Sequence, residues 1–393
     1  MDSAPDLSIL TDPVAHADGR ADRLWPWMRR HAPVHWHDAG SYPGFWSVVR
    51  YSDVRAVYLD HETFSSAKGV MLRPLALGDD PAGGAALALT DPPRHGDIRA
   101  LVGDLFAGRA VRALEEDLRK STRAVLDQAV EAGTCDFAHD VAARLTITVI
   151  CALLGVPEAD RDQVRRWIDA SFAAGRPLAT NHEFMGYLLQ LMDERTVSPS
   201  NDIVSRLVHG EVAGAPLSDL EILFNCENIA GAAENSGLSM ATGMLAFIDN
   251  PVQWQLLVDH RELLPGAAGE MMRWASSATH SMRTATTAGR IGDQAIRPGD
   301  RVVVWLRSAN RDEAVFADPD VFDIARRPNR HLAFGAGAHA CIGAALARIQ
   351  TTVLLSEILE SGIRFESAGA PTPLPSIVVG GQKHLPMRLW RTA

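Results

Sequence analysis

Apolar residues recur at helical spacing through the middle of the chain, whereas strand-like alternation is confined to short stretches nearer the ends. Residues 91–251 are predicted to be largely helical, because their apolar positions follow the helical period and β-branched runs are few. Strands are predicted in three β-rich regions, at about residues 30–60, 283–306 and 365–393. No repeat, low-complexity tract or linker divides the chain. The pattern therefore predicts a single domain over residues 1–393, mainly α with a small β-rich subregion.

The longest predicted helix lies between Ser218 and Pro251. Ser218 and Glu221 have the spacing of a capping box, and no proline follows before Pro251. A helix of about 31 residues would be about 45 Å long, at roughly 1.5 Å per residue. Its middle, Gly231–Gly237, contains two glycines and three polar side chains in an otherwise apolar helix. This departure predicts either a polar stripe that faces solvent or a buried helix that bends around a ligand.

Composition and charge narrow the classes of function. The 38 Lys and Arg against 48 Asp and Glu give a net charge of −10, which argues against nucleic acid or an acidic membrane surface as the main partner. No stretch approaches the roughly 20 apolar residues of a membrane-spanning helix, and the N-terminal residues do not resemble a signal peptide. The four cysteines form neither a CxxC pair nor a disulfide framework. A cytoplasmic protein with reduced thiols is expected.

The most informative stretch is a glycine-rich loop around Cys341, Phe334-Gly-Ala-Gly-Ala-His-Ala-Cys-Ile-Gly343, followed by a predicted helix. The glycines let backbone amides approach a sulfur, and a helix N-terminus nearby favours the thiolate. A lone thiolate with one open face suits a single axial bond to haem iron, whereas zinc needs three or four protein ligands. A dinucleotide-binding loop is disfavoured, because the spacing is G-x-G-x5-G and no β-branched strand leads into it.

This loop resembles the haem-binding signature of the cytochrome P450 superfamily, F-G-x-G-x-H/R-x-C-x-G. Glu270 and Arg273 match the family's E-x-x-R pair, and Arg326 resembles the third member of its structural Glu-Arg-Arg triad. The resemblance extends from about Trp25 to the last predicted strand and is closest to the soluble bacterial, actinomycete-like class. It implies the haem-thiolate fold, haem b (iron protoporphyrin IX) as the cofactor and Cys341 as the proximal ligand of the haem iron.

The resemblance also implies roles for other residues. The expected partners of the haem propionates are His95, Arg99, Arg283 and His331, and further haem contacts are expected from Ala230, Phe334, Gly335, His339 and Gly343. The family's oxygen-binding helix reads A/G-G-x-D/E-T-T/S, and alignment on the acid gives Glu234, Asn235 and Ser236 as the catalytic residues. Asn235 thus stands where the family usually has threonine. An amide donates a hydrogen bond but is a poor proton relay, so Ser236, Glu234, ordered water or a substrate hydroxyl could serve instead.

The activity that the resemblance implies is that of a monooxygenase, an oxidoreductase that uses O2 and two electrons. It would hydroxylate, epoxidise or oxidatively couple a mid-sized organic substrate in secondary metabolite biosynthesis, as a monomer. The chain is too short to include a flavin reductase, so a separate ferredoxin and ferredoxin reductase are expected, docking on Arg99, Arg109, Arg112 and Arg348. Two alternatives stay open: a haem protein that binds a ligand or carrier protein without oxygen turnover, and a peroxide-driven peroxygenase.

Substrate contacts can be placed only by region. The resemblance implies residues 70–89, 167–189, 229–234, 278–282 and 378–381, which are largely apolar and include Met71, Phe172, Phe184, Met185 and Met282. Core packing explains each of these side chains about equally well. The polar exceptions, Asn181 and His280, could orient a substrate.

Overall fold

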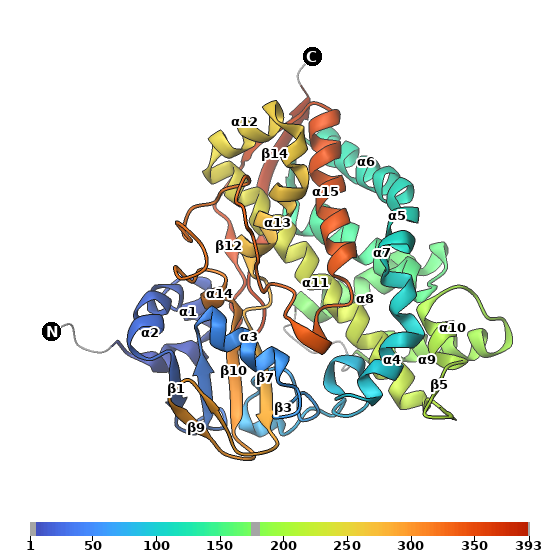
Figure 1. Ribbon diagram of the computed structural model, residues 1–393. Helices are drawn as coiled ribbons and strands as arrows, with labels where there is room; N and C mark the ends of the chain where they lie inside the picture. Colours follow the sequence, from blue (N-terminus) through green and yellow to red (C-terminus); the bar gives the residue numbers. More distant parts are fainter. Residues whose placement is uncertain (1–4, 174–180, 392–393) are drawn as a thin grey trace.

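The computed structural model describes residues 5–173 and 181–391. Its outline is roughly triangular, with helices in the upper and right-hand parts and the largest sheet at the lower left (Figure 1). This mainly helical architecture with small sheets confirms the fold class expected from the sequence. The α-helices are α1 (Pro13–Ala17), α2 (Trp25–His31), α3 (Tyr51–Leu59), α4 (Arg94–Val102), α5 (Gly108–Ala113), α6 (Glu115–Ala132), α7 (Arg144–Leu154), α8 (Arg161–Ala173), α9 (His182–Val197), α10 (Ile203–Val208), α11 (Asp219–Asp249), α12 (Pro251–Asp259), α13 (Leu264–Ala275), α14 (Leu306–Ala309) and α15 (Ala344–Glu360).

The strands form one five-stranded sheet and several smaller ones. The large sheet has the order β1-β2-β10-β7-β3, in which β10 runs parallel to β2 and the other neighbours are antiparallel. A three-stranded sheet, β11-β14-β4, joins the C-terminal strands to the middle of the chain. The strands are β1 (Val34–His37), β2 (Phe45–Val48), β3 (Phe64–Ser65), β4 (Thr134–Asp136), β5 (Glu211–Val212), β6 (Ala215–Pro216), β7 (His280–Ala285), β8 (Gly289–Ile291), β9 (Gln294–Ile296), β10 (Arg301–Trp305), β11 (Ile363–Ser367), β12 (Thr372–Pro373), β13 (Gln382–His384) and β14 (Pro386–Arg391).

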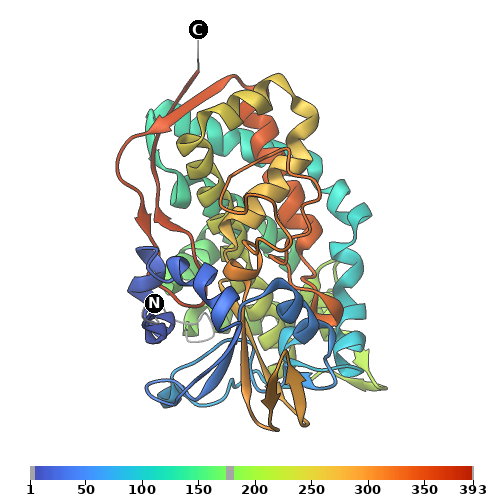
Figure 2. The same ribbon diagram turned by 60° about the vertical axis from the view of Figure 1, so that its left-hand side comes forward.

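The three predicted β-rich regions contain strands, with one local difference. Within residues 30–60, the stretch Tyr51–Leu59 is helix α3 rather than a strand. Its buried residues Val54, Val57 and Tyr58 follow helical spacing, so they form one face that packs against the core. Figure 2 shows the C-terminal segment running along one side of the helical part towards the N-terminal helices, and Ile377 packs in the same cluster as Trp25.

Helix α11 runs through the centre of the helical part (Figure 1). It has the 31 residues expected from the sequence, and both hydrogen bonds of the Ser218–Glu221 capping box are present. It packs against α7 and α13, and Gly243 permits the close approach to α13. A Cβ atom at Gly243 would lie only 2.3 Å from the Cε atom of Met271. The helix therefore separates two groups of core helices and exposes little of its surface to solvent.

Helix α15 is held against α6 by a buried carboxylate. Glu357 is fully buried, and its carboxylate accepts hydrogen bonds from the guanidinium groups of Arg119, at 2.7 Å, and Arg123. Because a buried charge is tolerated only with such partners, this cluster fixes how α15 sits beside α6. The loop that contains Cys341 leads directly into α15.

One helical stretch in the described part of the chain, Phe137–Leu154, is long and apolar enough to cross a membrane. It comprises a π-helical turn and α7, and 67% of it is buried inside the fold. Such burial is typical of a core helix.

Candidate functional site

A cavity of about 330 Å³, called the main cavity below, lies beside the middle of α11. Its walls come from α4, α7, α11, β7, the loop around Cys341 and the start of α15. Segments far apart in the sequence thus converge on one space. Ten of the expected site residues line it: His95, Arg99, Asn235, Ser236, Arg283, Phe334, Gly335, His339, Cys341 and Gly343.

The loop around Cys341 is a tight turn that only glycine can form at two positions. Gly335 has φ +64° and Gly337 has φ +71°, and a Cβ atom at Gly337 would lie 2.7 Å from the carbonyl oxygen of Tyr58. The amide of Cys341 donates a hydrogen bond of 2.9 Å to the carbonyl oxygen of Phe334, which closes the turn. The Cys341 side chain is accessible from the main cavity although protein surrounds it.

Opposing influences act on the pKa of the Cys341 thiol. Burial raises this pKa, whereas a hydrogen bond from the backbone of Gly343 and the charges of Arg99 and Arg348 lower it. The net direction of the shift is upward, opposite to the influence expected of the helix N-terminus. Desolvation of the sulfur outweighs the nearby donors, and a positive charge inside the main cavity would be needed to favour the thiolate.

Cationic and imidazole groups gather at one edge of the main cavity. Arg283 is only 4% exposed. Its guanidinium donates hydrogen bonds to the Ser281 hydroxyl, at 2.8 Å, and to the Met282 carbonyl oxygen, at 2.7 Å. The same group lies 5.2 Å from the centre of the Tyr58 ring. Among the described residues no carboxylate lies within ion-pair distance of it. Burial without an anion lowers the pKa of Arg283. Arg99 and the rings of His95 and His339, which are tilted by 47° with centroids 4.2 Å apart, lie along the same cavity.

Tyr58 is a cavity residue that was not predicted from the sequence. It lines the main cavity from α3, a region where strands were predicted, and its ring faces the Arg283 guanidinium. The signal that could have identified it is its position beside Val54 and Val57 on one apolar helical face. Thr146 and Ile150 of α7 also line the main cavity, and their sequence gave no sign of it because they lie in an apolar helix.

The three polar residues of α11 separate onto two sides of the helix. Asn235 and Ser236 line the main cavity, so the polar stretch faces an internal space rather than solvent. Glu234 does not line the main cavity. It faces a second cavity of about 140 Å³, whose other lining residues include His139 and His384. Thr146 lines both cavities. Glu234 is thus separated from the other two polar residues, because its side chain leaves α11 in another direction. Burial raises the pKa of Glu234 to about 7.

Two expected haem contacts do not line the main cavity. Ala230 is fully buried in the core, one turn before Glu234 on α11. The imidazole of His331 lies beside the ring of Phe334 and accepts a hydrogen bond of 3.3 Å from the amide of Ala333. Burial lowers the pKa of His331 to about 4, which favours its neutral form.

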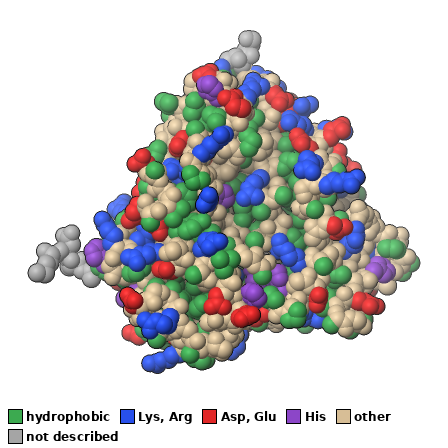
Figure 3. All heavy atoms as spheres, in the orientation of Figure 1, with side chains coloured by type: hydrophobic (Ala, Val, Ile, Leu, Met, Phe, Trp, Pro, Cys, Tyr) green, Lys and Arg blue, Asp and Glu red, His purple; other side chains and the backbone are tan. Residues whose placement is uncertain are grey.

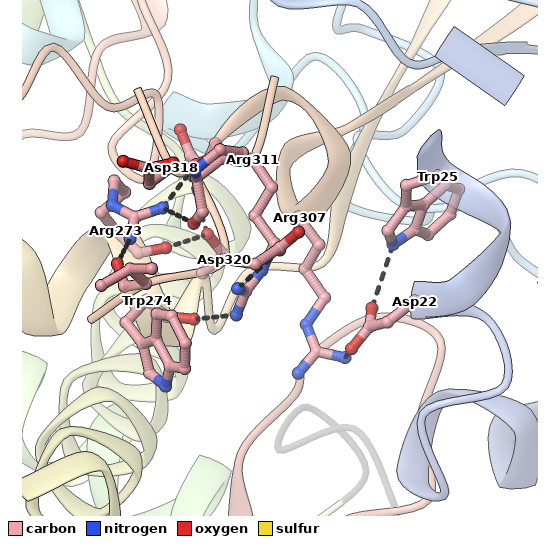
Figure 4. Close-up of polar contacts among 12 residues, drawn as sticks. Asp22, Trp25, Arg273, Trp274, Arg307, Arg311, Asp318 and Asp320 are labelled. Atoms are coloured by element: carbon pink, nitrogen blue, oxygen red, sulfur yellow. Dashed lines mark hydrogen bonds and ion pairs between the residues drawn. The ribbon is translucent and has the colours of Figure 1, made fainter. Parts of the chain in front are cut away.

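Glu270, Arg273 and Arg326 form a buried network away from the main cavity. Arg273 donates to both carboxylate oxygens of Glu270, at 2.7 and 2.8 Å, and also to backbone carbonyls that include that of Pro319. Arg326 lies 3.3 Å from the same carboxylate. Figure 4 shows Arg273 next to Trp274 and the loop that carries Asp318 and Asp320. The network ties α13 to this loop and so supports the chain segment that precedes Cys341.

The expected substrate regions contribute unequally to the main cavity. Residues 70–89, 229–234 and 278–282 supply lining residues, and residues 378–381 do not. No described residue of 167–189 lines it, and the side chain of Phe172 and residues 174–180 lie outside the described residues. Asn181 caps α9, where its side chain accepts from the amide of Phe184, so it does not orient a substrate.

Burial of His280 predicts a loss of stability in acid. Its pKa is lowered from 6.5 to about 4, because the fully buried imidazole is desolvated. The unfolded chain therefore takes up this proton at higher pH than the native protein, and stability is full above pH 6.5 and falls as the pH drops towards 4. We expect the free energy of unfolding to fall by about 2 kcal/mol between pH 7.5 and 5 from this residue.

Urea unfolding of the wild type and of His280→Gln at both pH values measures this contribution. The variant, which has no titrating group there, should lose correspondingly less stability in acid. An identical pH dependence in both proteins would contradict the assignment.

Comparison with known proteins gives a consistent picture. Residues 249–367 match the model of the Cytochrome P450 family. Over 384 residues the chain is 40% identical to cytochrome P450 126 of Mycobacterium tuberculosis, covering 93% of this chain and 92% of that protein. It is 34% identical to cytochrome P450 NovI of Streptomyces niveus, over 97% of this chain and 96% of that protein. P450 OxyD is involved in the biosynthesis of vancomycin-type antibiotics, and its crystal structure superposes on this chain with a TM-score of 0.91. The two sequences are 31% identical, and the superposition covers 98% of this chain and 99% of that one.

Proposed function

Because this chain belongs to the cytochrome P450 family of haem b-dependent monooxygenases, we propose that Cys341 is the thiolate ligand of the haem iron and that the main cavity holds haem and substrate. The observation that carries this proposal is the convergence of Cys341 and the anion-free guanidinium of Arg283 on one cavity. When bound, the haem supplies the chemistry that activates O2 for insertion into an organic substrate.

The residues around the main cavity fit such a cofactor. A haem has a flat apolar body, two carboxylates and an iron whose charge favours a thiolate. Arg99, Arg283 and His95 would hold the carboxylates through charge-assisted or neutral hydrogen bonds, with His339 beside them. Phe334, Gly335 and Gly343 would pack against the haem around Cys341, and a positive iron would offset the burial that raises the pKa of this thiol. The contacts assigned to Ala230 and His331 are not part of this proposal, because neither residue lines the main cavity.

We propose that Ser236, next to Asn235 on the α11 side of the main cavity, holds and moves protons there. The side-chain oxygen of Asn235 is buried without a hydrogen-bond partner, so this amide is poorly placed to take part in a relay. Ser236 supplies a hydroxyl in the same cavity. Glu234, with a pKa near neutrality, would exchange protons with the second cavity behind α11.

Restoring a hydroxyl at position 235 should change how efficiently electrons are used. We expect Asn235→Thr to lower the fraction of reducing equivalents lost as hydrogen peroxide by roughly twofold or more, because a threonine hydroxyl can relay a proton and an amide cannot. The measurement compares NADPH consumed, peroxide released and product formed, with Asn228→Thr as a matched control on the same helix and cavity. An unchanged ratio of peroxide to product would show that protons bypass this position.

We propose oxidation of a mid-sized organic substrate in secondary metabolite biosynthesis, with O2 as the oxidant. The support is the family membership and the similarity to P450 OxyD, a protein of antibiotic biosynthesis. Spectral titration of the purified holoprotein with candidate metabolites, followed by product analysis with supplied redox partners, tests this. Product formation only with added peroxide would favour the peroxygenase alternative, and binding without turnover the ligand-binding alternative.

Electrons are proposed to come from a separate ferredoxin and its reductase, delivered to a monomeric, cytoplasmic, single-domain protein. Arg109, Arg112 and Arg348 are exposed on the face formed by α5 and α15, whereas Arg99 is partly enclosed and bonds the carbonyl of Ala340. On the face seen in Figure 3, Lys and Arg side chains are scattered among acidic and apolar ones rather than gathered in one patch. Docking would therefore depend on a few arginines.

Reversing two of these charges should slow reduction of the haem protein. For the variant Arg109→Glu with Arg112→Glu, we expect the second-order rate of reduction by an acidic ferredoxin to fall about tenfold at low salt, since opposite charges steer association. The difference should shrink as salt is raised. Stopped-flow reduction measures the rate, and spectral titration with substrate should be unaffected. Arg290→Glu, on the distant β8, is the control, and an equal effect of that variant would contradict a local docking surface.

A further inference from the structure

Residues 70–89, called the wall segment here, form a largely irregular stretch that lines the main cavity at both of its ends. Val70 and Met71 line the cavity at one end, and Leu87 and Ala88 line it at the other. The segment contains only two short 3₁₀ turns, and its middle is exposed, with Leu75 52% and Leu77 57% accessible. In Figure 1 it is the pale blue coil at the base of the molecule, between β3 and α4. Its position over the cavity must therefore be set by contacts near its ends.

His280 holds the first end of the wall segment. The Nε2 atom of its imidazole accepts a hydrogen bond of 2.9 Å from the amide of Leu72, and its Nδ1 atom donates to the carbonyl oxygen of Ile377 at 2.8 Å. Because an amide N–H can only donate, Nε2 must be unprotonated and the ring neutral. The ring of Trp305 packs against it at 5.2 Å between centroids. Both nitrogens are thus used by backbone groups, and neither is free for a substrate.

Asn225 holds the second end from helix α11. Its Oδ1 atom accepts a hydrogen bond of 2.8 Å from the amide of Leu87, and its Nδ2 atom donates to the carbonyl oxygens of Ala85, at 3.1 Å, and Glu221, at 2.7 Å. The carboxamide therefore pairs with the wall segment as a neighbouring strand would. Asn225 is 2% exposed, so losing these bonds would leave buried backbone groups unpaired.

Few other bonds join the wall segment to the rest of the protein. Among the described residues two backbone bonds do so, from the amide of Met282 to the carbonyl of Val70 and from the amide of Leu75 to the carbonyl of Ser41. The exposed ion pair of Arg301, on β10, with Asp79 adds a third link at 3.5 Å. In the described part of the chain, His280 and Asn225 are the only side chains from helices or strands that hydrogen-bond to its backbone. Much of the remaining polar bonding, such as the ion pair of Arg73 with Asp80, is internal to the segment.

We propose that His280 and Asn225 are a pair of positioning residues that hold the wall segment against the main cavity and so set the affinity for substrate-sized ligands. The proposal rests on the proposed function in one respect, that ligands bind in the main cavity beside the haem. His280 also lines the main cavity, but both of its ring nitrogens bond backbone groups, so it acts by positioning the segment; Asn225 does not line the cavity. Loss of the His280 bond to Leu72 would let the first end of the wall segment move away from the cavity. Loss of the Asn225 bonds to Ala85 and Leu87 would release the second end in the same way.

Paired variants separate the two bonds of His280. His280→Asn keeps a donor near the position of Nδ1 for Ile377 and removes the acceptor for Leu72, whereas His280→Gln keeps an acceptor near the position of Nε2. Asn225→Ala removes both bonds to Ala85 and Leu87. His16→Gln is the control, because His16 is another buried histidine that bonds a backbone carbonyl, of Leu10 at 2.9 Å, and stacks on Trp305, but does not touch the wall segment.

Hydrogen–deuterium exchange of the holoprotein and azole binding give two independent readouts. We expect His280→Asn and Asn225→Ala each to speed exchange of peptides from residues 70–89 by about tenfold or more, with His280→Gln nearer to the wild type and no change in His16→Gln. The dissociation constant of 4-phenylimidazole should rise about fivefold or more in the first two variants, while that of imidazole, a smaller ligand with less contact to the cavity wall, should change less than about twofold.

Unchanged exchange in residues 70–89, or exchange that rises equally in α15 and β10, would overturn the proposal. Equal weakening of imidazole and 4-phenylimidazole binding would also contradict it. The exchange measurement does not depend on how iron is bound, so failure of the proposed function, seen as the wrong iron ligand in the wild type, is distinguishable from failure of this inference.

Discussion

Cys341→Ser should abolish monooxygenase activity while leaving a folded chain. A serine hydroxyl is not ionised near neutral pH and is a poor donor to iron, so the electron donation that favours O–O cleavage is lost. We expect substrate-dependent product formation to fall by at least about 100-fold, with stability in urea changed by less than about 1 kcal/mol, because the side chain faces a cavity rather than the packed core. Product analysis with supplied redox partners measures the loss.

Cys135→Ser is the matched control for this variant. Cys135 is a free cysteine on β4, outside the main cavity, and burial raises the pKa of its thiol to about 12. Its replacement should preserve activity. Comparable activity in the wild type and in Cys341→Ser would show that another residue binds the iron or that the reaction does not need this cofactor.

Arg273→Ala should be among the most destabilising single substitutions in this protein. It removes a fully buried guanidinium that donates to Glu270 and to three backbone carbonyls, and it leaves the Glu270 carboxylate buried with Arg326 and Asn329 as its remaining side-chain partners. Breaking a buried charge pair by removing one partner costs about 3–5 kcal/mol. We expect a loss of that size in the free energy of unfolding by urea, and a low yield of holoprotein.

Lys120→Ala provides the comparison with a surface ion pair. Lys120 lies 3.1 Å from Glu116, one helical turn away on α6, with both side chains exposed. Exposed pairs of this kind contribute about 0–1 kcal/mol. Equal destabilisation by the two substitutions would contradict the view that burial gives the Glu270–Arg273 network its effect.

The features that sequence fixes locally were predictable. Helix α11 was recognisable from its capping box and from Pro251, because both act within one turn of the chain. The Cys341 loop was recognisable because its glycines are needed for positive φ and close packing at Gly335 and Gly337. A serine followed three residues later by a glutamate, or glycines spaced closely around a cysteine, rarely occurs for any other structural reason.

Features that depend on tertiary packing were not predictable. The direction of the Glu234 side chain depends on its rotation about α11, which is set by packing against α7 and the C-terminal strands. The upward pKa shift of Cys341 depends on burial, which the loop sequence does not reveal. Likewise, Tyr58 and Arg283 meet only because α3 and β7 pack together, although they are 225 residues apart in the numbering of the chain.

The absorption spectrum of the reduced holoprotein with carbon monoxide tests the central claim most directly. If the Cys341 sulfur binds the haem iron, purified wild-type protein should show the red-shifted Soret band of a thiolate-ligated ferrous carbonyl complex. A Soret band like that of an imidazole-ligated globin would contradict the claim, as would the absence of haem in protein produced with ample haem precursor.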